Sequence, residues 1–93
     1  MTSAAPLLDL VRDGERVTVQ IPRLPAGSTA FDVVTGIQRA VIGGTLGPGD
    51  RFSDDEGLAT AFGISQRLVR RGMLILVDAG QATKDGPTGW RLA

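Results

Sequence analysis

The sequence contains no cysteine, no histidine and no tyrosine, and its aromatic side chains are three phenylalanines and one tryptophan. Without cysteine the chain cannot form disulfides or thiolate centres, and without histidine it lacks the commonest zinc ligand. No apolar run approaches the roughly 18 residues that a membrane-spanning helix needs. We therefore expect a cytoplasmic protein that is not an enzyme, needs no cofactor or metal and does not enter a membrane.

The ten basic and ten acidic residues cancel to a net charge of zero, but they are unevenly distributed. Residues 1–66 carry five arginines against eight acidic residues, whereas residues 67–93 carry five basic residues against two acidic ones. A zero net charge argues against nucleic acid, because phosphate neutralisation supplies much of the affinity. A basic excess confined to one end of the chain instead favours a defined DNA-contacting surface.

Two helix signals joined by a short turn occupy the stretch from Gly49 to Gly80. We expect the first helix to begin with a capping box formed by Ser53 and Glu56. Gly63 can adopt a left-handed backbone and end that helix, and Ser65 is a suitable cap for the next. This spacing is typical of a helix-turn-helix.

The helix that begins after Ser65 carries different chemistry on its two faces. An inward stripe is expected from Val69, Met73 and Leu76. The polar side chains near its start suit base and phosphate contacts in a major groove. We expect base contacts from Gln66 and Arg67 and phosphate contacts mainly from Arg70 and Arg71, with Ser65 also part of the DNA-binding site.

Further along the same helix, apolar residues extend around most of its circumference. Leu74, Ile75 and Val77 exceed what one buried side requires, so something must cover them. The candidates are the N-terminal segment and a second copy of the chain. Because one reading helix contacts too few base pairs for high specificity, we expect a homodimer.

The N-terminal part of the chain predicts a short helix from Pro6 to Val11, closed by Asp13-Gly14, and then a strand over residues 16–21, whose residues alternate apolar and polar. A helix from about Ala30 to Ile42 should bury one apolar stripe. Arg51-Phe52 can add a short bridging strand.

After Gly80 the sequence predicts a two-stranded hairpin over residues 81–92. We expect Trp90 to anchor this hairpin to the helices. Lys84 and Arg91 are candidate phosphate contacts there.

One set of residues recurs in a known pattern, a Gly-x-Leu-x-Pro-Gly-Asp turn followed by Leu-Ala, Gly-hydrophobic-Ser, Val-Arg and Leu. Its members here are Gly44, Leu46, Pro48, Gly49, Asp50, Leu58, Ala59, Gly63, Ile64, Ser65, Val69, Arg70 and Leu76. With these residues, positions 28–92 resemble the winged helix-turn-helix domain of the GntR family of bacterial transcription regulators. One departure is that Glu56 stands where the family has an arginine that touches the DNA backbone, and another is that the family's large effector domain is absent.

The resemblance implies an α+β, mostly helical fold, in which a winged helix-turn-helix over residues 28–93 follows an extension of residues 1–27 that holds a short helix and a strand. It also implies a small transcription regulator, a repressor, that binds double-stranded DNA through the helix from Ser65. With the effector domain absent, no small-molecule effector is expected.

Two alternatives remain open. One is an accessory or architectural DNA binder of phage or plasmid type, which acts in recombination or copy control. The other is a winged helix used for protein contact, which Glu56 and the zero net charge would suit. Salt-dependent DNA affinity separates the DNA binders from the protein-contact module, and DNA bending separates a regulator from an architectural protein.

Overall fold

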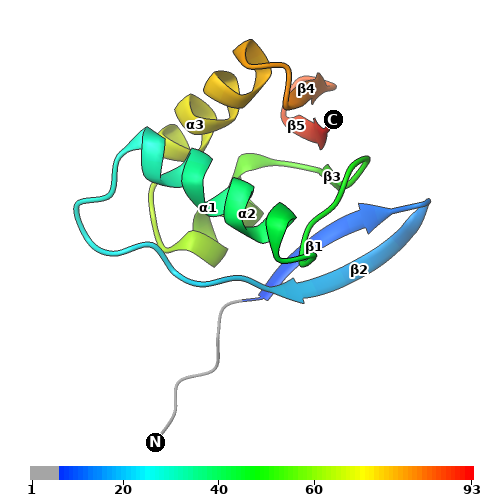
Figure 1. Cartoon of the computed structure of the whole chain (residues 1–93), viewed down its shortest axis with the longest axis horizontal. Coiled ribbons are helices and arrows are strands. Elements are labelled where there is room, and N and C mark those ends of the chain that lie inside the picture. Colours follow the sequence, from blue (N-terminus) through cyan, green and yellow to red (C-terminus); the bar gives the residue numbers. More distant parts are fainter. Residues whose placement is uncertain (1–6) are drawn as a thin grey trace, which may run out of the picture.

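The computed structural model describes residues 7–93, which form three helices and a five-stranded antiparallel sheet (Figure 1). The strand order is β2-β1-β3-β5-β4, so the two-residue strand β3 joins an N-terminal hairpin to a C-terminal one. In chain order the elements are β1 (Leu7–Arg12), β2 (Glu15–Gln20), α1 (Ala30–Ile42), β3 (Arg51–Phe52), α2 (Asp55–Phe62), α3 (Gln66–Asp78), β4 (Ala82–Asp85) and β5 (Gly89–Leu92).

The N-terminal helix predicted from the sequence is wrong, because Leu7–Arg12 is strand β1; Pro6 lies outside the described residues. Asp13 and Gly14 form the turn between β1 and β2 and have φ angles of 53° and 79°. Positive φ at both turn residues is the geometry of a two-residue hairpin, for which Asp-Gly is a strong signal. The alternating strand β2 thereby gains its hydrogen-bonding partner, and Leu8 and Leu10 of β1 point to the same face and are buried.

The predicted fold class, a mostly helical winged helix, is also wrong. Helices hold 39% of the described residues and strands hold 25%, and all five strands join one antiparallel sheet. The N-terminal hairpin causes the difference, because β1 pairs with β3 through Val11 and Arg51 and so extends the sheet. The fold is therefore α+β with a five-stranded sheet.

Other elements lie where the sequence predicted them. Helix α1 spans Ala30–Ile42, α3 begins at Gln66, and β4 and β5 pair as a hairpin. The predicted bridging strand is β3, and the predicted strand over residues 16–21 is shifted by one residue in β2.

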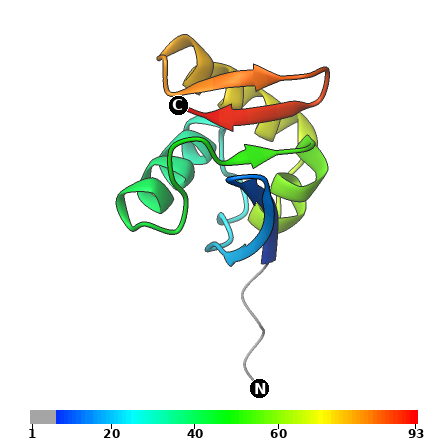
Figure 2. The ribbon, with the colours of Figure 1, turned by 90° about the vertical axis from the view of Figure 1, so that its right-hand side faces the viewer.

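One hydrophobic core lies between the helices and one face of the sheet (Figure 2). The sheet contributes Leu8, Leu10, Phe52, Trp90 and Leu92, and Trp90 is fully buried as predicted. Residues 7–21 thus supply part of the same core as the rest of the chain. The helices contribute Val33, Ile37, Leu58, Ala61, Phe62, Val69, Met73 and Leu76.

Helices α1 and α3 cross closely at Gly72. A Cβ atom at this position would lie 2.6 Å from Val33 Cβ and 3.0 Å from the carbonyl oxygen of Ala30. Only a hydrogen in place of a side chain permits this approach. Among the helices of residues 7–93, none has the length and apolar character to cross a membrane.

Candidate nucleic-acid interface

The turn between α2 and α3 presents the start of α3 to solvent. Gly63 ends α2 with a left-handed φ of 73°, and its amide donates to the Ala59 carbonyl oxygen at 2.8 Å. Ser65 then caps α3, its hydroxyl accepting from the Leu68 amide at 3.2 Å. Both residues act as the sequence predicted.

The cap of α2 differs from the prediction. Asp54, and not Ser53, is the N-cap residue, and its carboxylate accepts from the Gly57 amide at 3.0 Å. The predicted capping box of Ser53 and Glu56 is therefore wrong by one residue. An aspartate is as effective a cap as a serine, so the run Ser53-Asp54 left the start of the helix ambiguous by one position.

The four polar side chains predicted at the start of α3 are all exposed, whereas Val69 and Met73 are buried. Gln66 lies at the edge of the buried stripe, because Met73 follows it by seven residues, and Arg67 and Arg71 lie farther from that stripe. Residues four apart lie above one another on a helix. Gln66 and Arg70 therefore form one row, and Arg67 and Arg71 form a second row beside it. The two rows present an amide and three guanidinium groups on about two turns of helix.

Arg70 lies near the start of α2 and, through Asp55, near the C-terminal hairpin. Trp90 in β5 donates from its indole nitrogen to Asp55 Oδ1 at 2.5 Å, and Arg70 Nε is 4.0 Å from Asp55 Oδ2. Lys84 in β4 places its ammonium group 5.7 Å from the centre of the Trp90 ring, a cation–π distance. Asp55 and Trp90 thus connect the hairpin, the start of α2 and the row of Arg70.

Arg91 does not join this surface. Side chains alternate along a strand, and its neighbours Trp90 and Leu92 point into the core. Arg91 is therefore on the opposite face of the sheet, where it pairs in register with Arg51. On the same side of the sheet, Asp85 accepts from Arg51 Nε at 2.7 Å. Of the two cations predicted to contact phosphate at the hairpin, only Lys84 lies on the helix side.

The three residues predicted at a dimer interface differ in exposure. Leu74 is 45% exposed, whereas Ile75 and Val77 are half-buried and Val77 packs against the core. Leu74 follows Arg67 by seven residues and Arg71 by three, so it lies on the same side of α3 as these arginines. Helix α3 packs mainly against α1, α2 and β4, while the N-terminal hairpin packs against β3 and α2.

An ion pair that the sequence did not indicate fixes the N-terminal hairpin to the turn before β3. Arg12 donates from Nε to Asp50 Oδ1 at 2.9 Å and from Nη2 to Asp50 Oδ2 at 2.8 Å, and Nη2 also donates to the Thr45 carbonyl oxygen at 3.0 Å. Asp50 accepts as well from the Gly47 amide at 2.8 Å. The hydrogen bonds from Arg12 hold the pKa of Asp50 below its ordinary value, and the same pairing raises the pKa of Arg12.

Asp55 is the second polar residue whose role the sequence did not indicate. Its position in the first turn of α2 predicts only favourable charge at the positive end of the helix dipole. In the structure its carboxylate is 13% exposed and accepts from Trp90. The one signal in the sequence was the predicted burial of Trp90, because a buried indole N–H requires an acceptor.

Comparisons of the chain with protein-family models, with curated proteins and with solved structures found no match. The resemblance to the GntR family therefore stays a prediction, and the function is argued from the surface described above.

Proposed function

We propose that the protein is a sequence-specific DNA-binding transcription regulator of the cytoplasm, a repressor, that reads the major groove with α3. The observation that carries the proposal is the pair of polar rows at the exposed start of α3. A helix that presents an amide and three guanidinium groups near its exposed start matches the donor and acceptor pattern of a major groove. The resemblance of residues 28–92 to the GntR domain supports the same function.

We assign a role to each side chain from its distance to the start of α3. The first residues of a reading helix enter a groove deepest, so Gln66 and Arg67 are placed for base edges. Arg70 and Arg71 lie one turn later and are placed for phosphate. The contact with Asp55 holds Arg70 toward the hairpin, on whose helix side Lys84 supplies a further positive charge.

The overall electrostatics support the same orientation. The five basic residues after position 66 include the three arginines of α3 and Lys84, and only two acidic residues accompany them. DNA would therefore approach the side of α3 in preference to the N-terminal hairpin. A homodimer would double the number of base pairs read, which a single short reading surface needs for specificity.

The test is selection of bound sites from a random double-stranded DNA library, followed by affinity measurements at several salt concentrations. Arg70→Ala should reduce the slope of log affinity against log salt by about one unit, because one phosphate contact is lost. Arg16→Ala is the matched control, since Arg16 is also an exposed arginine but lies on β2, at the sheet edge opposite β4. Its slope should equal that of the wild type.

Failure to enrich any site, together with affinity that does not depend on salt, would contradict the proposal and favour protein contact. Strong bending of a bound fragment with little sequence preference would contradict the regulator and favour an architectural DNA binder.

A further inference from the structure

The outward side of α1 carries large apolar side chains that nothing in the described chain covers. Within residues 7–93 five large hydrophobic residues are exposed, and three of them lie on this helix. Phe31 at its start is 70% exposed, and Val41 and Ile42 at its end are 38% and 86% exposed. The opposite side of α1 buries Val33 and Ile37 in the core, so the helix is apolar on its outward side as well as on its inward side.

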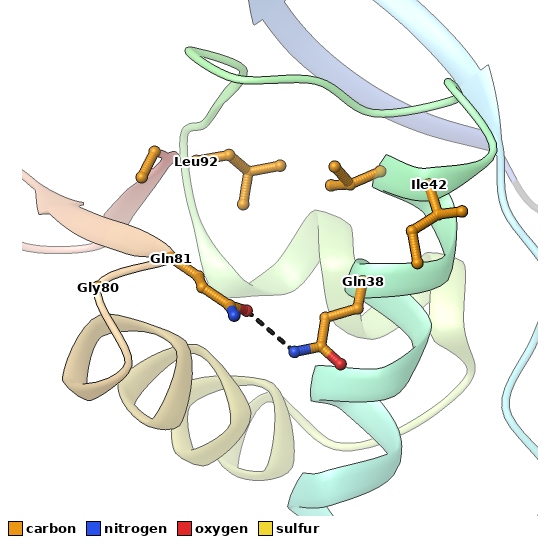
Figure 3. Close-up of a pocket in the computed structure, with 7 residues that line it drawn as sticks. Gln38, Ile42, Gly80, Gln81 and Leu92 are labelled. Atoms are coloured by element: carbon orange, nitrogen blue, oxygen red, sulfur yellow. Dashed lines mark hydrogen bonds between the residues drawn. The ribbon is translucent and has the colours of Figure 1, made fainter.

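A groove lies beside the C-terminal end of α1 (Figure 3). It has a volume of about 450 Å³, and Val41, Ile42 and Leu92 give it apolar walls. Gln38 crosses one side of it and donates to Gln81 at 2.9 Å. The groove is therefore large enough to receive an aromatic side chain.

The exposed Phe31 side chain lies at one end of α1, and the groove lies at the other end of the same helix. Phe31 and Ile42 are eleven residues apart, which is about three turns and 16 Å of rise, and both point outward. If two copies of α1 run antiparallel about a two-fold axis near Gly36, Phe31 of each copy meets Ile42 and the groove of the other. An isologous interface requires such self-complementarity.

The flanks of α1 fit the same arrangement. In an antiparallel helix pair each flank faces the same flank of the partner. Asp32 and Arg39 are exposed and share one flank of α1. Asp32 Oδ2 accepts from the Thr29 amide at 2.7 Å in the helix cap, but the carboxylate keeps its charge, so each residue would face its opposite charge on the second copy. Val34 and Val41 share the other flank; Val34 packs partly against the core, so Val41 supplies most of the exposed apolar surface there. All these pairs are centred within one and a half residues of Gly36, the middle of the helix.

A parallel pair of α1 helices would not bring complementary side chains together. It would set the charged flank of one copy against the apolar flank of the other. It would also place Phe31 beside Phe31 and leave both grooves empty.

We propose that α1 pairs antiparallel with α1 of a second copy of this chain, with Phe31 seated in the groove beside Ile42 of that copy. This deepens the homodimer of the proposed function by naming its surface, and it uses none of the α3 residues assigned to DNA contact. An interface over Leu74 would instead cover a position close to Arg71.

Light scattering after size exclusion, at micromolar concentrations, tests the interface. The wild type should show twice the chain mass of 9.7 kDa. Phe31→Glu should raise the dimer dissociation constant about tenfold to a hundredfold, because a buried aromatic becomes a charge. Phe31 is exposed in the single copy, so this variant should keep the circular dichroism spectrum of the wild type.

Leu74→Glu is the matched control, because it also places a charge at an exposed apolar position, on α3. It should remain dimeric. A wild type that is monomeric throughout, or a Phe31→Glu variant with unchanged mass, would overturn the proposal. So would a Leu74→Glu variant that is monomeric while Phe31→Glu remains dimeric.

Cysteine cross-linking tests the orientation, since the chain has no cysteine of its own. A mixture of the single variants Phe31→Cys and Ile42→Cys should form a disulfide between the two, while Phe31→Cys alone should not cross-link. Efficient cross-linking of Phe31→Cys alone would overturn the antiparallel pairing. The mass measurements need no DNA, so a failed dimer and a failed DNA-binding function are distinguishable.

Discussion

Replacing Gly72 with alanine should destabilise the protein even though alanine is the better helix former. The new Cβ atom would lie 2.6 Å from both Cβ and Cγ1 of Val33. Carbon atoms in contact prefer separations of about 3.5 to 4.0 Å, so α1 and α3 must move apart by roughly 1 Å. Because Gly72 lies in the core between two helices, this movement disturbs packing on both sides.

The two opposing effects can be compared in magnitude. Overpacking of a core costs about 1 to 3 kcal/mol, and a Gly-to-Ala change inside a helix recovers at most about 1 kcal/mol. Two contacts of 2.6 Å and one of 3.0 Å with backbone put the cost in the upper half of that range, about 2 to 3 kcal/mol, so the expected net loss in the free energy of unfolding is about 1 to 2 kcal/mol. For a domain of this size, a loss of 1 kcal/mol lowers the melting temperature by roughly 4 to 8 °C.

Gly57 provides the matched control, because it is also a helical glycine but is exposed. A Cβ at Gly57 would have Asp54 Oδ1 as its nearest neighbour at 3.6 Å, an ordinary contact. Gly57→Ala should therefore stabilise the protein by up to about 1 kcal/mol. Urea unfolding of the two variants should give changes of opposite sign. A Gly72→Ala variant as stable as the wild type would refute the close crossing of α1 and α3.

Two further variants test the polar contacts of the structure. Asp50→Asn should lower the free energy of unfolding by about 2 to 3 kcal/mol, because the charged hydrogen bonds from Arg12 are weakened. Since the folded pKa of Asp50 is lowered, its contribution is complete above the unfolded value of about 4 and is lost as the pH falls through the folded pKa. Acid titration of stability should therefore be flatter for Asp50→Asn, and an equally steep titration would refute the pair. Trp90→Phe should cost about 1 to 3 kcal/mol by leaving Asp55 without its donor, whereas Asp55→Asn, which still accepts from the indole, should cost less. Equal stability of these two variants in thermal unfolding would contradict that contact.

The helices could be predicted from the sequence because their signals are local. Ser65 and Gly63 set the turn between α2 and α3 by capping chemistry alone, and the apolar stripe with Val33 and Ile37 sets α1. The exposed rows of α3 follow from helical spacing once Val69 and Met73 are assigned to the core. This part of the candidate site therefore needed no tertiary information.

The N-terminal strand was predicted wrongly although its main partner, β2, is local, because Asp13-Gly14 suits both a helix end and a hairpin turn. Leu7–Arg12 has apolar residues that suit either a helix or a strand, and the Asp13-Gly14 turn decides between them. The pairing of β1 with β3 joins residues about 40 positions apart in sequence. The contacts of Asp50 and Asp55 arise in the same way, because their partners lie in distant elements.

The sequence also could not predict on which face of the sheet a charged side chain lies. Lys84 and Arg91 were equally plausible phosphate contacts while the register of the hairpin was unknown. In the structure Lys84 pairs with Trp90 and Arg91 pairs with Thr83, which puts the two cations on opposite faces. Only Lys84 remains a candidate phosphate contact on the helix side of the hairpin.

The central claim is that α3 reads DNA sequence through its first turn, and the specificity of Arg67→Ala tests it most directly. Competition binding should compare the variant and the wild type on a selected site and on its single-base variants. Arg67→Ala should lose discrimination at one or two base positions, by about 1 to 3 kcal/mol at each, and Arg70→Ala should weaken binding to all sequences alike. Unchanged affinity and unchanged base preference in Arg67→Ala would contradict the claim that this helix is the reader.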